Sequence, residues 1–192
     1  MVDSATSWPD TIVDFFDLAK IAAEKSTFYG GSYNALLNYL FPFEQGYMVV
    51  PQLKRSEQSK AVDFTADFTA VFVVLYAEHP IFFLEVKGTN KLFQMSTRQA
   101  ADQQMREQFY NLFDDLQINV LYGVSAFDTQ LCLYTLARDT GRIEPDAIHM
   151  DPNYVIDTAP EERWGIDLLT TEGEQLLRQV VTHIEMMLEG DK

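Results

Sequence analysis

The chain has 192 residues, of which 47% are hydrophobic and 13% aromatic, enough for a single domain over residues 1–192. Its formal net charge of −15 disfavours nucleic acid as a partner without excluding it, because duplex binding usually depends on Lys and Arg neutralising phosphates. No apolar run approaches the roughly 20 residues that cross a bilayer, which argues against a membrane protein. The amino end lacks the basic and apolar regions of a secretory signal, and a single cysteine, Cys132, permits no internal disulfide. We therefore expect an intracellular protein, cytoplasmic or nuclear.

The first half of the chain predicts two helices followed by three strands. Apolar residues recur at helical spacing in the helices, and the glycines of Tyr29–Ser32 are expected to separate them. The last two strands are joined by a short turn, so they must form an antiparallel hairpin. The predicted segments are Ser7–Ser26, Tyr33–Phe41, Tyr47–Leu53, Val62–Tyr76 and Ile81–Lys87.

The second half predicts a long helix, two or three strands and a closing helix. The long helix is expected to start with a capping box over Ser96–Gln99, and a loop of low periodicity should precede the last helix. The predicted segments are Ser96–Leu116, Asn119–Phe127, Leu131–Ala137, Arg142–His149 and Thr171–Leu188. The order of helices and strands predicts an α+β protein with a mixed central sheet and additional N- and C-terminal helices.

The strand Ile81–Lys87 carries two opposite charges in an otherwise apolar sequence. Side chains of a strand alternate between its faces, so Glu85 and Lys87 project from one face while Phe82, Leu84 and Val86 point to the other. A buried carboxylate is costly unless it is paired or binds a metal. The pattern therefore points to a divalent-metal site with a lysine beside it. The alternative is a strand whose end simply emerges into water, closed by Gly88.

The order helix, three strands, helix, strand, with E-x-K on the third strand, resembles the PD-(D/E)xK, or restriction-endonuclease-like, superfamily of phosphodiesterases. More narrowly, the chain resembles short uncharacterised fungal members of that superfamily, over nearly its whole length. The segments that carry the narrower resemblance are Tyr33–Leu37, Val62–Thr65, His79–Lys87 and Asp157–Trp164. The resemblance implies an αβββαβ core.

The resemblance also implies a Mg²⁺ or Mn²⁺ site held by an Asp and a Glu on facing strands, because such hard cations prefer carboxylate oxygens. Glu85 would be one ligand and Lys87 the catalytic lysine. The tripeptide Asp-Phe-Thr occurs twice, so the Asp is either Asp67 or Asp63. We favour Asp67, because hairpin register brings it nearer to Glu85. A lysine beside two carboxylates stays charged, which favours an orienting role in the attack of water.

Helical positions would complete such a site. The superfamily often has a Glu on its first helix, but Tyr33–Phe41 contains no acid, so this role would fall to Glu24 on the preceding helix. Because of that departure, the metal site lacks one carboxylate ligand unless Glu24 provides it. On the helix after E-x-K, Gln103 is expected to contact substrate. Basic residues of the middle third are the expected phosphate contacts: Lys54, Arg98 and Arg106.

Two functions follow from these residues. The first is a Mg²⁺-dependent nuclease that hydrolyses DNA or RNA. The second is a catalytically inactive protein that keeps the nuclease fold as a protein-interaction module, as a homodimer or with another protein. The acidic charge and the missing acid on the helix Tyr33–Phe41 favour the second.

Overall fold

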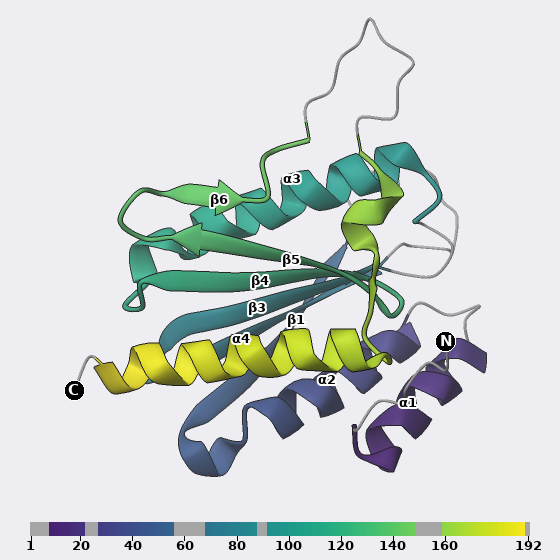
Figure 1. The fold of residues 1–192 in the computed structure, drawn as a ribbon, viewed down its shortest axis with the longest axis horizontal. Coiled ribbons are helices and arrows are strands. Elements are labelled where there is room, and N and C mark those ends of the chain that lie inside the picture. Colours follow the sequence, from purple (N-terminus) through teal and green to yellow (C-terminus); the bar gives the residue numbers. More distant parts are fainter. Residues whose placement is uncertain (1–7, 22–26, 56–67, 88–91, 149–158, 191–192) are drawn as a thin grey trace, which may run out of the picture.

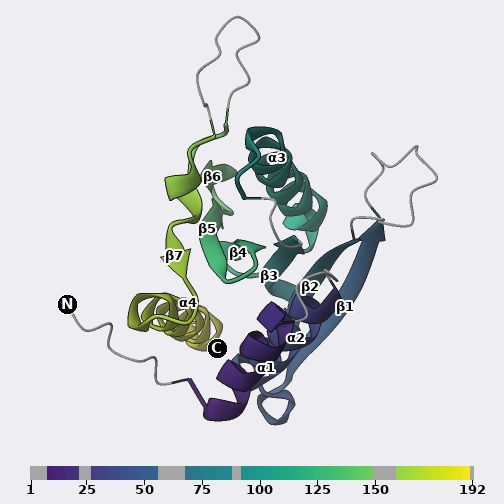
Figure 2. The ribbon, with the colours of Figure 1, turned by 90° about the vertical axis from the view of Figure 1, so that its right-hand side faces the viewer.

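The computed structural model describes residues 8–21, 27–55, 68–87, 92–148 and 159–190. A mixed sheet lies between two layers of helices (Figures 1 and 2). The helices are α1 (Asp10–Ile21), α2 (Thr27–Leu40), α3 (Met95–Leu112) and α4 (Thr171–Gly190). The strands are β1 (Tyr47–Arg55), β2 (Phe68–Tyr76), β3 (His79–Lys87), β4 (Val120–Phe127), β5 (Gln130–Ala137), β6 (Arg142–Glu144) and β7 (Ile166–Asp167). Short 3₁₀ helices include η3 (Glu161–Trp164).

The described strands form one sheet in the order β1-β2-β3-β4-β5-β6, and β7 pairs with β5. β3 and β4 run parallel, and all other neighbouring pairs are antiparallel. α3 connects the two parallel strands, as parallel neighbours require a crossover. The predicted α+β class, the hairpin of β2 and β3, and the mixed sheet are confirmed.

Both faces of the sheet are covered. Phe82, Leu84 and Val86 of β3 pack into the core shared with α1, α2 and α4. Phe83 points to the other face and packs with Met105 and Phe109 of α3. β3 is therefore buried on both sides, as expected of a strand in a central parallel pair.

α2 differs from the prediction because the two glycines do not end a helix. Gly30 and Gly31 lie inside α2, which begins at Thr27. Tyr29 and Tyr33 on either side of them are buried against Phe16 of α1, with ring centroids 6.4 and 5.0 Å from it. Packing of these rings outweighs the poor helix propensity of glycine.

Three smaller differences concern the ends of elements. α3 begins at Met95 with Gln94 as its N-cap, so the predicted capping box at Ser96 is wrong. β6 ends at Glu144, well before the predicted end of that strand. The segment expected to be a loop before the last helix contains η3 and β7.

β1 lies at one edge of the described sheet, and Pro51 stands in its middle, opposite Phe72 of β2. Proline in a sheet is confined to such edges, because it has no N–H to donate to a neighbour. Within the described residues, no helix is both long enough and apolar enough to cross a membrane.

Candidate functional site

Glu85 and Lys87 form a buried ion pair at the end of β3. Their side chains lie on the face covered by α3, and the residues are 2% and 7% exposed. Nζ of Lys87 lies 2.8 Å from Oε1 of Glu85. The alternative of a strand end emerging into water is therefore wrong, and the predicted sharing of one face is confirmed.

A glutamine of α3 completes the surroundings of the lysine. Nζ of Lys87 also donates to Oε1 of Gln104. Gln103, expected to contact substrate, instead lies on the exposed side of α3 and donates to Oε1 of Glu107 at 2.9 Å. The phase of α3 explains the difference: Ala101 and Met105 are buried, and Gln104 lies closer to their side of the helix.

The described neighbours of Glu85 in the sheet bring no second carboxylate. Val71 of β2 stands opposite it, and Ser125 lies beside it on β4. In the parts of the chain that the structure describes, no three His, Cys, Asp or Glu side chains are grouped to hold a metal ion. The predicted ligands Asp67, Asp63 and Glu24 lie outside the described residues, and so does the side chain of Lys54.

The two arginines expected to contact phosphate are bonded to the protein itself. Arg98 is 1% exposed and donates to the carbonyl oxygens of Ala159 and Leu92 and, at 3.3 Å, to Oε1 of Glu161. Arg106 is bonded to Asp102 and to the carbonyl oxygen of Pro145. Both side chains fasten neighbouring segments to α3.

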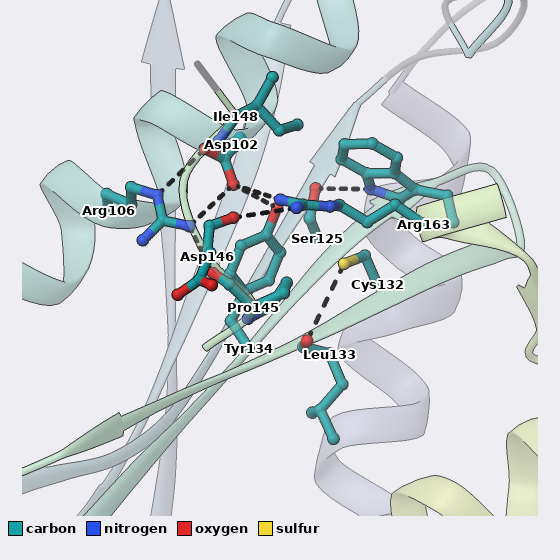
Figure 3. Close-up of polar contacts among 11 residues, drawn as sticks. Asp102, Arg106, Ser125, Cys132, Leu133, Tyr134, Pro145, Asp146, Ile148 and Arg163 are labelled. Carbon is teal, nitrogen blue, oxygen red and sulfur yellow. Dashed lines mark hydrogen bonds and ion pairs between the residues drawn. The ribbon is translucent and has the colours of Figure 1, made fainter. Parts of the chain in front are cut away.

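A buried carboxylate that the sequence analysis missed is the centre of this polar region (Figure 3). Asp102 is 3% exposed. Its oxygens accept from Nε and Nη2 of Arg106 at 3.0 and 3.2 Å, and from Nη1 of Arg163 at 2.9 Å. The hydroxyl of Tyr134 and the backbone N–H of Ile148 also donate to it, at 3.1 and 3.0 Å. Five donors therefore compensate the burial of this charge.

This network extends to the neighbourhood of Glu85. Arg163 belongs to η3, and the next residue, Trp164, is fully buried. Nε1 of Trp164 donates to Oγ of Ser125 at 3.2 Å, and Ser125 is the β4 neighbour of Glu85. The polar contacts of α3 and η3 thus position the surroundings of the ion pair.

Burial also shifts the pKa of two further groups, Cys132 and Asp128. Cys132 is buried on β5, and burial raises the pKa of its thiol to about 12, which disfavours the thiolate that a nucleophile needs. Asp128, in the turn after β4, has a buried Oδ1 with no hydrogen-bond partner among the described residues, and burial raises the pKa of its carboxyl to about 6.

Comparison with known protein families, with curated proteins and with solved structures gives no match for this chain.

Proposed function

We propose that the protein is a Mg²⁺- or Mn²⁺-dependent phosphodiesterase that hydrolyses DNA or RNA, with Glu85 as a metal ligand and Lys87 as the catalytic lysine. The observation that carries the proposal is the buried Glu85–Lys87 pair at the carboxyl end of β3. The element order α2-β1-β2-β3-α3-β4 also agrees with the αβββαβ core that the resemblance to the restriction-endonuclease-like superfamily implies.

Burial of this pair needs an explanation beyond stability. Removing two charges from water costs several kcal/mol, and apolar replacements of similar size are often as stable. Functional sites hold their charged groups in fixed orientations, as Glu85 and Gln104 hold Lys87. A pair held between β3 and α3 is therefore better explained by chemistry than by packing.

The described donor set fits a hard cation in part. Oε1 of Glu85 accepts a hydrogen bond from Lys87. Its other carboxylate oxygen, Oε2, has no hydrogen bond to any described residue and is left for a ligand. The second carboxylate of the proposal is Asp67, or Asp63 in its place. When bound, the cation would acidify a water molecule and neutralise the scissile phosphate. Glu85 and Gln104 both accept from Nζ of Lys87 and fix its direction, so the lysine would orient the nucleophile.

A second candidate is the inactive interaction module. Two observations favour it: Arg98 and Arg106 are both engaged by protein groups, and the formal net charge is −15. In that case the Glu85–Lys87 ion pair binds neither a metal ion nor a substrate.

Thermal unfolding in EDTA, Mg²⁺ and Mn²⁺ tests the proposal, with cleavage of mixed nucleic acids assayed in the same samples. The variant is Glu85→Gln, and the matched control is Glu107→Gln, an exposed position on α3. We expect metal to stabilise wild type and control by about 2.7 kcal/mol at 100 times Kd, and not the variant.

Cleavage should follow the same pattern, being present in wild type and control with metal and lost in the variant. The catalytic proposal would be contradicted if metal left the melting temperature of the wild type unchanged and no cleavage occurred. That result would favour the interaction module.

A further inference from the structure

One face of α1 exposes large apolar side chains between carboxylates. Phe15, Leu18 and Ile21 are 47%, 60% and 84% exposed. Asp14 precedes Leu18 by four residues and Asp17 precedes Ile21 by four, so each pair lies side by side on the helix surface. Asp10 continues the same side toward the helix start. These six residues form what we call the acidic–apolar face.

The fold of α1 does not depend on this face. Ile12, Phe16 and Ala19 on the opposite side of the helix are buried in the core. α1 packs on α2 and is the outermost helix of its layer (Figure 2). Burial of apolar surface is the main favourable contribution to most protein–protein association, so the exposed three side chains can drive binding.

The charges of the face indicate what would cover it. Among the described residues, Asp10, Asp14 and Asp17 have no ion-pair partner. An apolar surface flanked by carboxylates is complementary to an amphipathic helix that carries Lys or Arg beside its apolar stripe. A second copy of this chain would bring the same carboxylates against them, which is unfavourable.

We propose that the acidic–apolar face of α1 is a docking surface for a basic amphipathic helix of a partner protein. The face lies on the opposite side of the sheet from α3 and the Glu85–Lys87 pair. The docking surface is therefore independent of the proposed catalysis, and either can hold without the other.

Titration of the full chain with a Leu/Lys model helix of about 18 residues tests this, since that length forms five turns. A Leu/Glu helix of the same pattern is the control peptide. The first variant is Leu18→Gln with Ile21→Gln, and the second is Asp14→Asn with Asp17→Asn. Matched controls on α4 are Met186→Gln, which is 63% exposed in the wild type, and Glu172→Gln. All substituted side chains are exposed, so melting temperatures should stay close to wild type.

We expect the Leu/Lys helix to bind, each double variant to weaken it about tenfold or more, and the α4 controls to stay within about twofold. The Leu/Glu helix should not bind. If the Leu/Lys helix bound all variants equally, its binding would be unspecific charge attraction, and the proposal would be overturned. A wild-type dimer in sedimentation that Leu18→Gln with Ile21→Gln abolishes would also overturn it, because the face would then join two copies of this chain.

Discussion

Asp128 is an acidic side chain that the fold holds at a cost. It lies in the turn between β4 and β5 with a positive φ of 55°, and its carbonyl oxygen accepts from the hydroxyl of Tyr33 at 2.7 Å. Burial raises the pKa of its carboxyl to about 6 from 3.8, so the folded state binds the proton more tightly than the unfolded chain does. The charged carboxylate therefore opposes folding above about pH 6, and this penalty fades as the pH falls toward 4.

Asp128→Asn should raise the free energy of unfolding at pH 7.5 by on the order of 1 kcal/mol, after allowance for solvent screening. Asparagine tolerates the left-handed backbone of this position. Urea denaturation from pH 4 to 8 measures the difference, which should shrink as the pH falls. Asp139→Asn, in the exposed turn after β5, is the matched control. A gain that does not depend on pH would contradict the assignment to the charge.

Asp102 has the opposite role, because its charge is fully compensated. Asp102→Asn would leave Arg106 and Arg163 without their counter-charge, and breaking a buried pair costs about 3–5 kcal/mol. Urea denaturation should show this loss. Arg142→Gln removes an exposed pair with Glu144 and should cost less than about 1 kcal/mol. A similarly small loss of unfolding free energy in Asp102→Asn and Arg142→Gln would show that the Asp102 network is solvated.

At the scale of the elements, the glycines of two helices should respond in opposite ways to an added methyl group. Beyond the backbone of its own helix, a Cβ on Gly31 of α2 would meet no atom of the described residues within 4 Å. A Cβ on Gly173 of α4 would collide with the carbonyl oxygen of Asp167, which is backbone and cannot move aside without shifting the chain.

Gly31→Ala should therefore stabilise the protein by about 0.5–1 kcal/mol, the gain in helix propensity. Gly173→Ala should destabilise it by about 1–3 kcal/mol, as other forms of overpacking do. Thermal unfolding of both variants measures the contrast. A loss of stability in Gly31→Ala would mean that α2 needs the smaller residue for a contact.

Local patterns predicted those parts of the fold whose partners lie close in sequence. The hairpin of β2 and β3 follows from a short turn, and the shared face of Glu85 and Lys87 follows from the period of a strand. The start of α2 was missed because packing of Tyr29 and Tyr33 is a tertiary effect. β7 has two residues and depends on its pairing with β5, so it leaves no periodic signal.

In the candidate site too, features set by local sequence could be predicted and those set by tertiary contacts could not. Gln103 is the glutamine that the sequence predicts as a substrate contact, but the phase of α3 against the sheet turns its neighbour Gln104 inward to Lys87. The donors to Asp102 other than Arg106 come from Tyr134, Ile148 and Arg163, which lie 32, 46 and 61 residues away. A sequence pattern cannot bring such distant positions together, and Asp102 itself resembles any polar residue on a helix.

For the whole molecule, self-repulsion follows from the formal net charge of −15. Dissolved salt screens exposed charges over about 10 Å at 0.1 M, which favours the compact state of a strongly charged protein. We expect the melting temperature to rise by a few degrees between about 50 and 500 mM NaCl. An equal rise with a neutral osmolyte alone would assign the effect to solvent exclusion, and a fall would indicate that ion pairs dominate.

Pro51 limits how copies of this protein can aggregate. A free sheet edge is a template on which another chain can polymerise, and amyloid grows in this way. The middle of β1 offers one amide proton fewer than such growth needs, because proline has none. At this edge of the described sheet, Pro51 therefore disfavours the addition of a further strand.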